Sequence, residues 1–346
     1  MKKQKQEAVE LARYINIFLH EYAPVHLTSS RHTLKSYQTA LFLFITFLEC
    51  EKGVQSISLK PDCFCRVNIE QWIGWLMNTR TCSSGTANNR LASLRTFLKY
   101  LGSRNPSYLY LYQEALVIPR KKGIRKKICG LPREAVQIFL KAPDISAKTG
   151  RRDLAFMILL YSTAARIDEI LDMKVGQLHL AGKKPYANVI GKGNKMRTLY
   201  LLPKTVAHIE KYLHEFHSEP PEQEAYLFYS RNTGIYGKMS QPAVDKFLKK
   251  YARKCHECCP DIPLNLHAHL LRHSKASHWL EDGMNIAQIS FLLGHENLQT
   301  TMIYLDISTE NLSEALATLE EEKDKEIVPK WKNADGSLVD FCRLRP

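Results

Sequence analysis

The chain has 346 residues, which is long enough for two domains, because single domains usually hold roughly 100–200 residues. Its 49 Lys and Arg outnumber its 35 Asp and Glu by 14, and such an excess favours a polyanionic partner, either nucleic acid or an anionic membrane. The longest apolar stretch, residues 154–165, is shorter than the roughly 20 residues that cross a bilayer, and no apolar segment follows the basic N-terminus as in a signal peptide. We therefore expect a cytoplasmic protein that binds nucleic acid and has no membrane partner.

Nine cysteines, an odd number scattered along the chain, are typical of a reducing compartment rather than of a disulfide framework. Cys255, Cys258 and Cys259, with His256 among them, resemble half of a zinc site. A second pair of ligands at the expected spacing is missing from the sequence. Free thiols are therefore the better interpretation, and we expect no metal.

Positive charge is concentrated in the first third of the chain, where residues 1–128 hold 20 Lys and Arg against 8 Asp and Glu. Apolar residues recur there at helical spacing in four segments, within 9–19, 41–48, 69–77 and 87–101. These features predict a helical DNA-binding domain over residues 1–115. For any single basic residue the alternative is a solvated surface charge, and the candidate DNA contacts are Arg31, Lys35, Arg90 and Arg95.

Residues 116–130 are basic, contain Pro and Gly and lack an amphipathic period, so they predict an interdomain linker. From Leu131 the helical pattern resumes, and a β-like stretch from Ala187 to Leu202 interrupts it. The turn-rich sequence in the middle of that stretch predicts an antiparallel hairpin, with further candidate DNA contacts at Lys195 and Arg197 near its tip. The expected fold class is therefore mainly α with a small antiparallel β-sheet.

The C-terminal region contains a narrow apolar stripe on an otherwise acidic helix, predicted over residues 309–322. A stripe of this width requires a partner surface to cover it. Residues 326–346 lack periodicity and are expected to form a loosely ordered tail.

Several segments of the second domain hold residue types suited to an anion. On a helix, His269, Arg272 and His273 share one face, so that imidazoles and a guanidinium converge. Glu169 lies one turn after Arg166, where its carboxylate can orient the guanidinium. Taken singly, each has an ordinary structural explanation, such as a surface ion pair or a core histidine.

Taken together, these segments resemble the tyrosine recombinase or phage integrase family. Five motifs occur in the family's order: Arg166 to Glu169, the Gly-Lys-Gly hairpin of residues 191–197, the His-x-x-Arg-His box of residues 269–273, Leu-Gly-His at residues 293–295, and Tyr304 nine residues later. The resemblance covers residues 130–320, and the helical N-terminal domain shows a weaker resemblance. Ala164 departs from the pattern, because the family often has Gly there.

The resemblance implies a SAM-like helical DNA-binding domain followed by an α+β catalytic domain over residues 131–325. It implies that the enzyme cleaves and rejoins DNA strands through a 3′-phosphotyrosyl intermediate, without a metal or a small-molecule cofactor. The implied roles are phosphate binding by Arg166, Arg272 and His295, support by Glu169, proton acceptance by His269, proton donation by Lys192 and nucleophilic attack by Tyr304.

The resemblance also implies double-stranded DNA with inverted-repeat recombination sites as partner, and a homo-tetramer on two duplexes that exchanges the helix at residues 309–322. The long C-terminal extension favours integration, excision or transposition of a mobile element over the task of a minimal Xer-like resolvase. One alternative is a type IB topoisomerase-like or DNA hairpin-resolving enzyme. Another is a non-catalytic DNA-binding regulator, which would have no need of Lys192 together with Tyr304.

Overall fold

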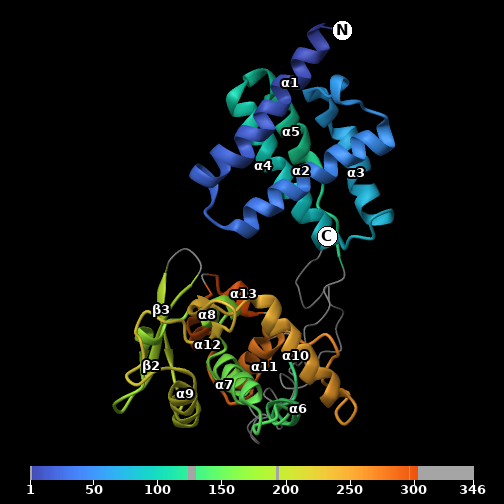
Figure 1. Cartoon of the computed structure of the whole chain (residues 1–346). Helices are drawn as coiled ribbons and strands as arrows, with labels where there is room; N and C mark the ends of the chain where they lie inside the picture. The colour runs from blue at the N-terminus through green and yellow to red at the C-terminus, as the bar shows by residue number, and fades with distance from the viewer. Residues whose placement is uncertain (1, 124–129, 192–194, 296, 303–346) are drawn as a thin grey trace, which may run out of the picture. The chain divides into compact units, whose positions relative to one another are not determined.

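The computed structural model describes residues 2–123, 130–191, 195–295 and 297–302. The chain forms two compact units that divide between Lys126 and Lys127, and each is described by itself (Figure 1). This division lies within residues 116–130, the predicted linker. Lys192, Tyr304, the helix predicted at 309–322 and the tail at 326–346 lie outside the described residues.

The N-terminal unit is helical, and its long helix α4 contacts three of its other helices. The α-helices are α1 (Lys2–Ile17), α2 (Arg31–Lys52), α3 (Arg66–Asn78), α4 (Ser84–Arg104) and α5 (Leu109–Val117). A π-helical segment, Phe18–Leu27, continues α1, and short 3-10 turns lie at Ser56–Ser58, Pro61–Phe64 and Pro106–Tyr108. The apolar stripe of α4, Leu91, Leu94 and Leu98, is buried as its spacing predicts. Phe44 of α2 and Trp72 of α3 are buried in the same core.

The segment after α5 stays attached to this unit. The side-chain amide of Asn88 on α4 donates to the carbonyl of Lys121 at 2.9 Å, and the Lys121 N–H donates back to Asn88 Oδ1 at 2.8 Å. Residues 118–121 therefore lie against α4, although they belong to the segment expected to be a linker.

The C-terminal unit is built mostly from helices around one apolar core. The α-helices are α6 (Arg133–Leu140), α7 (Lys148–Thr163), α8 (Ile167–Leu171), α9 (Pro203–Phe216), α10 (Gln241–His256), α11 (Ala268–Glu281), α12 (Ile286–Leu293) and α13 (Gln299–Met302), with a 3-10 turn at Val175–Gln177. Phe156 on α7 is fully buried, and its ring packs edge-on against Phe228 and Phe247. The buried helix α7 is thus the centre of the unit.

The unit also holds two small antiparallel sheets. The first has the order β1 (Leu178–His179), β2 (Tyr186–Ile190), β3 (Met196–Tyr200), and β2 and β3 form the hairpin predicted from the sequence. Figure 1 shows this hairpin at one side of the unit, and β2 contacts α8. The second is a ribbon of β4 (Tyr229–Ser230) and β5 (Gly234–Lys238), which was not predicted from the sequence.

Side-chain alternation on β3 determines which residues face the helices. Met196, Thr198 and Tyr200 are exposed, whereas Arg197 and Leu199 face inward. Arg197 is thus an inward-pointing charge on an edge strand. Among the helices of the described ranges, none is both long and apolar enough to cross a membrane.

Candidate active site

Arg166 stands at the junction between α7 and α8. Ala164, just after α7, adopts left-handed backbone angles with φ 48°, which turn the chain so that Arg166 becomes the residue preceding α8. The Arg166 N–H donates to Glu169 Oε2 at 2.7 Å, and Nη1 donates to Oε1 at 3.2 Å. Glu169 therefore orients Arg166, as the spacing predicts. Glycine adopts left-handed angles without steric cost, so the conformation of Ala164 fits the glycine that the family resemblance leads us to expect at this position.

Glu169 is buried, with 3% of its side chain exposed, and it pairs with a second arginine. Arg197 on β3 donates from Nε to Oε1 at 3.1 Å and from Nη2 to Oε2 at 2.6 Å. Burial alone would raise the pKa of Glu169, but the hydrogen bonds and charges of Arg197 and Arg166 outweigh it and lower the pKa. The carboxylate is therefore ionised and shared between two guanidinium groups.

Three successive carbonyls at the end of α12 each accept a bond from a different arginine. The Leu292 carbonyl accepts from Arg197 Nη1, the Leu293 carbonyl from Arg272 Nη2 at 2.6 Å, and the Gly294 carbonyl from Arg166 Nη2 at 2.9 Å. Carbonyls in the last turn of a helix lack intrahelical partners and carry the negative end of the helix dipole. The arginines thus fix the end of α12, directly before His295.

Arg272 on α11 connects the first arginine motif to the histidine motif. It is buried, with 1% exposed, and its Nη1 donates to the Ala164 carbonyl at 2.6 Å. Its Nη2 lies 3.2 Å from His295 Nε2. Because a guanidinium can only donate, Nε2 accepts, and the proton lies on Nδ1, which donates to Thr301 Oγ1 at 2.8 Å.

Three imidazoles near the arginines have lowered pKa values. Burial, followed by the charges of Arg272 and Arg166, lowers the pKa of His295 to about 4. Burial and the neighbouring His269 lower the pKa of His273 to about 4 as well. Loss of hydration, then the charge of Arg272, lowers the pKa of His269. All three imidazoles are therefore neutral at neutral pH.

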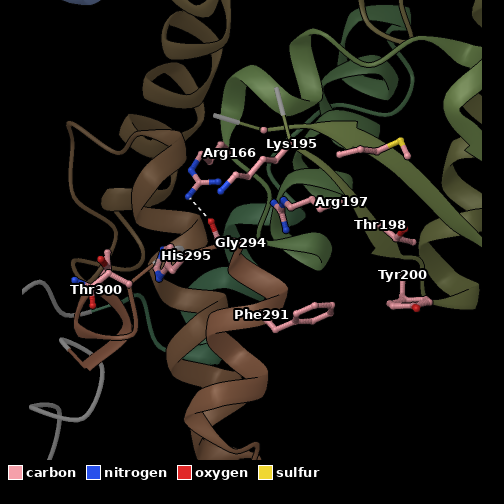
Figure 2. A pocket seen from close by; sticks show the side chains of 12 residues that line it. Arg166, Lys195, Arg197, Thr198, Tyr200, Phe291, Gly294, His295 and Thr300 are labelled. Carbon is pink, nitrogen blue, oxygen red and sulfur yellow. Dashed lines mark hydrogen bonds between the residues drawn. The ribbon is translucent and has the colours of Figure 1, made fainter. Parts of the chain in front are cut away.

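A pocket of about 680 Å³ opens beside these groups. Figure 2 shows Lys195 extending toward Arg166 on one side of the pocket, with Phe291 and Tyr200 on another. Arg166, Lys195, Arg197 and His295 all line this pocket. The positive charges of Arg166, Lys195 and Arg197, together with the volume, suit an anionic group attached to a larger molecule.

Six of the nine site residues predicted in the second domain meet around the end of α12. These are Arg166, Glu169, Lys195, Arg197, Arg272 and His295. His269 lies nearby on α11; its side chain is partly exposed, and its ring centroid is 4.4 Å from that of the buried His273. Lys192 and Tyr304 are outside the described residues, so their roles stay predictions.

The four candidate DNA contacts of the N-terminal unit have different surroundings. Arg31 and Lys35 on α2 are exposed. Arg90 is half-buried, and its Nη1 lies 3.4 Å from the Ser36 carbonyl. Arg95 donates to the carbonyls of Ala115 at 2.9 Å and Ile118 at 2.6 Å, and so holds the end of α5. The contacts of these four residues with DNA remain predictions.

Two contributions to the site were missed from the sequence. Thr301 is fully buried beneath His295, and no spacing rule indicates it. The sequence predicts Arg197 only as one of several charges near a hairpin tip. Because Arg197 lies two residues before the apolar Leu199 on the same strand, the alternation of side chains could have predicted that it faces inward.

Comparison with known proteins identifies the family. Residues 131–311 match the Phage integrase family. The chain belongs to this family, and it is a tyrosine site-specific recombinase. The integrase/recombinase y4rC of Sinorhizobium fredii is 30% identical over 298 residues, covering 84% of this chain and 85% of that protein. The tyrosine recombinase XerC of Chlamydia caviae is 28% identical over 295 residues, covering 81% and 90%.

The solved structures show the same fold. The Tn1549 transposon integrase in complex with transposon right end DNA superposes with a TM-score of 0.67 at 12% identity, covering 88% of this chain and 98% of that one. The fold class predicted from the sequence, mainly helical with small antiparallel sheets, is confirmed.

Proposed function

We propose that the recombinase cleaves a DNA strand by attack of Tyr304 on the scissile phosphate and rejoins it to a second strand through a 3′-phosphotyrosyl intermediate. The observation that carries the proposal is the set of three arginines on the carbonyls of residues 292–294. This arrangement holds Arg166 and His295 at one pocket. Tyr304 follows His295 by nine residues in the sequence.

Arg166 and Arg272 are proposed to bind the nonbridging oxygens of the phosphate. Negative charge builds on these oxygens during attack, and donors that are fixed beforehand stabilise it most. Arg166 keeps 35% of its side chain exposed at the pocket, so its guanidinium is accessible to a phosphate. Arg272 is buried behind Arg166 and would reach the phosphate through Nη2, the nitrogen that faces His295.

Proton transfer is assigned to two further side chains. A tyrosine phenol has a pKa of about 10, so attack requires removal of its proton. His269 is neutral, because its pKa is lowered, and a neutral imidazole can accept that proton. As the Tyr304 oxygen bonds to phosphorus, the 5′ oxygen leaves and takes a proton from Lys192. A 5′-hydroxyl of another strand reverses these steps, and the phosphodiester energy is kept without a cofactor.

The proposed partners are two DNA duplexes with inverted-repeat sites, bound by four protomers that exchange the helix at residues 309–322. The basic excess of residues 1–128 supports DNA binding by the segment 1–115, with 116–130 as linker, 131–325 as catalytic domain and 326–346 as tail. The Tn1549 structure contains transposon DNA, which supports a mobile element as the setting of the reaction. The cytoplasmic location stays a prediction.

A two-site assay tests the proposal. Duplexes that the protein selects from a random-sequence pool supply its site, and two copies are placed on one plasmid between distinguishable flanks. The proposal predicts molecules with exchanged flanks. Relaxation of a supercoiled plasmid without exchange would support the topoisomerase-like alternative, and binding without cleavage would support the regulator.

A further inference from the structure

We infer that Arg197 is a positioning residue for strand cleavage, which holds Arg166 and His295 in place from the inner face of β3. The inference rests on the proposed function, because it takes Arg166 as a group that binds the phosphate and His295 as its neighbour at the pocket. The sequence placed Arg197 among the DNA contacts, whereas its surroundings indicate a role within the protein.

Each nitrogen of the Arg197 guanidinium has a protein acceptor. Nε and Nη2 donate to the two oxygens of Glu169, and Nη1 donates to the Leu292 carbonyl. The side chain is 15% exposed, whereas Lys195, two residues earlier, is exposed. These bonds fix the position of the guanidinium within the protein in the absence of DNA.

The Glu169 carboxylate links the position of Arg197 to that of Arg166. Oε1 accepts from Arg166 Nη1 at 3.2 Å and from Arg197 Nε at 3.1 Å. Oε2 accepts from the Arg166 N–H at 2.7 Å and from Arg197 Nη2 at 2.6 Å. Because both oxygens are shared, rotation of the carboxylate would break the bonds to Arg166. The fork of Arg197 prevents that rotation.

The bond to the Leu292 carbonyl links the position of Arg197 to that of His295. Arg197 bonds the first of the three carbonyls that end α12, and the chain turns at Gly294 with φ +62°. A Cβ on Gly294 would lie 2.9 Å from Arg197 Cδ, so a larger residue would force the side chain away. The close approach of Arg197 therefore depends on glycine, directly before His295.

The charges support the same role. Glu169 carries one negative charge, and Arg166 and Arg197 each carry one positive charge, so the three groups together leave one positive charge beside the pocket. Without Arg197, Glu169 would neutralise Arg166 by itself. The attraction between Arg166 and a phosphate would then be weaker.

The test measures the rate of covalent adduct formation on nicked duplexes that carry a selected site. Arg197→Lys and Arg197→Ala are expected to slow the reaction about 100-fold, as small displacements of catalytic groups do. Arg152→Lys is the matched control, because Arg152 forms a half-buried pair with Asp153 at 2.6 Å and does not line the pocket at α12. That variant is expected to react at the wild-type rate.

A neutral substrate separates positioning from general damage to the fold. A methylphosphonate at the scissile position lacks one charged oxygen and so depends less on the positive charge of Arg166. The defect of both Arg197 variants should shrink to less than about tenfold on this substrate. If Arg197→Ala does not fold, Arg197→Lys carries the test, since it keeps the charge opposite Glu169 and loses the fork.

Equal defects on the phosphate and the methylphosphonate, or wild-type rates for both variants, would overturn the inference. A 5′-bridging phosphorothiolate supplies a leaving group that needs no proton. Rescue by that substrate instead would assign Arg197 to the leaving-group step and also overturn the inference. Absence of any adduct with the wild-type protein would be a failure of the proposed function itself.

Discussion

Arg166 and Arg197 bind the same carboxylate, that of Glu169, and then bond carbonyls two residues apart at the end of α12. Arg166 comes from the α7–α8 junction and Arg197 from the β-hairpin, so the shared carboxylate joins the helical core to the sheet. The pocket is therefore supported from two directions. Disturbance of either arginine should affect stability and chemistry together.

Glu169→Gln should lower the free energy of unfolding by about 3 kcal/mol, because it leaves Arg197 half-buried without its counter-charge. Urea unfolding measures the loss. The control is Glu215→Gln, which breaks a two-bond pair of similar geometry with Arg151, at 2.7 Å, on a more exposed surface. It should cost less than about 1 kcal/mol. Equal losses for the two variants would contradict a buried, shared charge.

Gly294→Ala should destabilise the protein by more than the roughly 1–2 kcal/mol that left-handed backbone angles cost an L-residue, because the new Cβ also meets Arg197. Gly283→Ala is the matched control. Gly283 also has a positive φ, of 79°, and nothing lies within 4 Å of its Cβ position. Thermal melts of both variants measure the difference. A Gly294→Ala loss no larger than the control's would contradict the close approach of Arg197.

The free energy of unfolding should fall as the pH drops from about 6.5 to 4. His273 and His295 have pKa values of about 4 in the folded protein, against roughly 6.5 when unfolded. Between these values the unfolded chain binds more protons, so acidification favours unfolding. Melting temperatures across this range measure the effect, and His273→Asn should flatten the curve. A melting temperature independent of pH here would contradict the lowered pKa values.

Arg31→Ala should reduce the slope of log affinity against log salt by about 1, if this exposed residue meets a DNA phosphate. Its melting temperature should be unchanged. Arg95→Ala should instead lower the melting temperature, because it removes the bonds that hold the end of α5. Salt titrations of binding, paired with melts, distinguish the two. An unchanged slope for Arg31→Ala would exclude it as a phosphate contact.

Local spacing predicted a large part of the site. Glu169 lies three residues after Arg166, and Gly294 follows an apolar helix, so both the ion pair and the helix end could be expected from neighbouring residues. The β2–β3 hairpin followed from its turn residues in the same way.

Long-range contacts could not be predicted. Arg166 and Gly294 are 128 positions apart, and Arg197 and Leu292 are 95 apart, so their bonds depend on how the hairpin and α12 pack in three dimensions. The role of Arg197 depends further on strand register, because a shift by one residue would turn it outward. Thr301 beneath His295 depends on the turn between α12 and α13.

The most direct test of the central claim is a covalent adduct between Tyr304 and DNA. Wild-type protein is incubated with nicked duplexes that carry a selected site, and the denatured product is digested and examined by mass spectrometry. We predict a denaturation-resistant adduct whose nucleotide lies on the peptide containing Tyr304, and none with Tyr304→Phe. An adduct that persists in Tyr304→Phe, or its absence from the wild type, would contradict the mechanism.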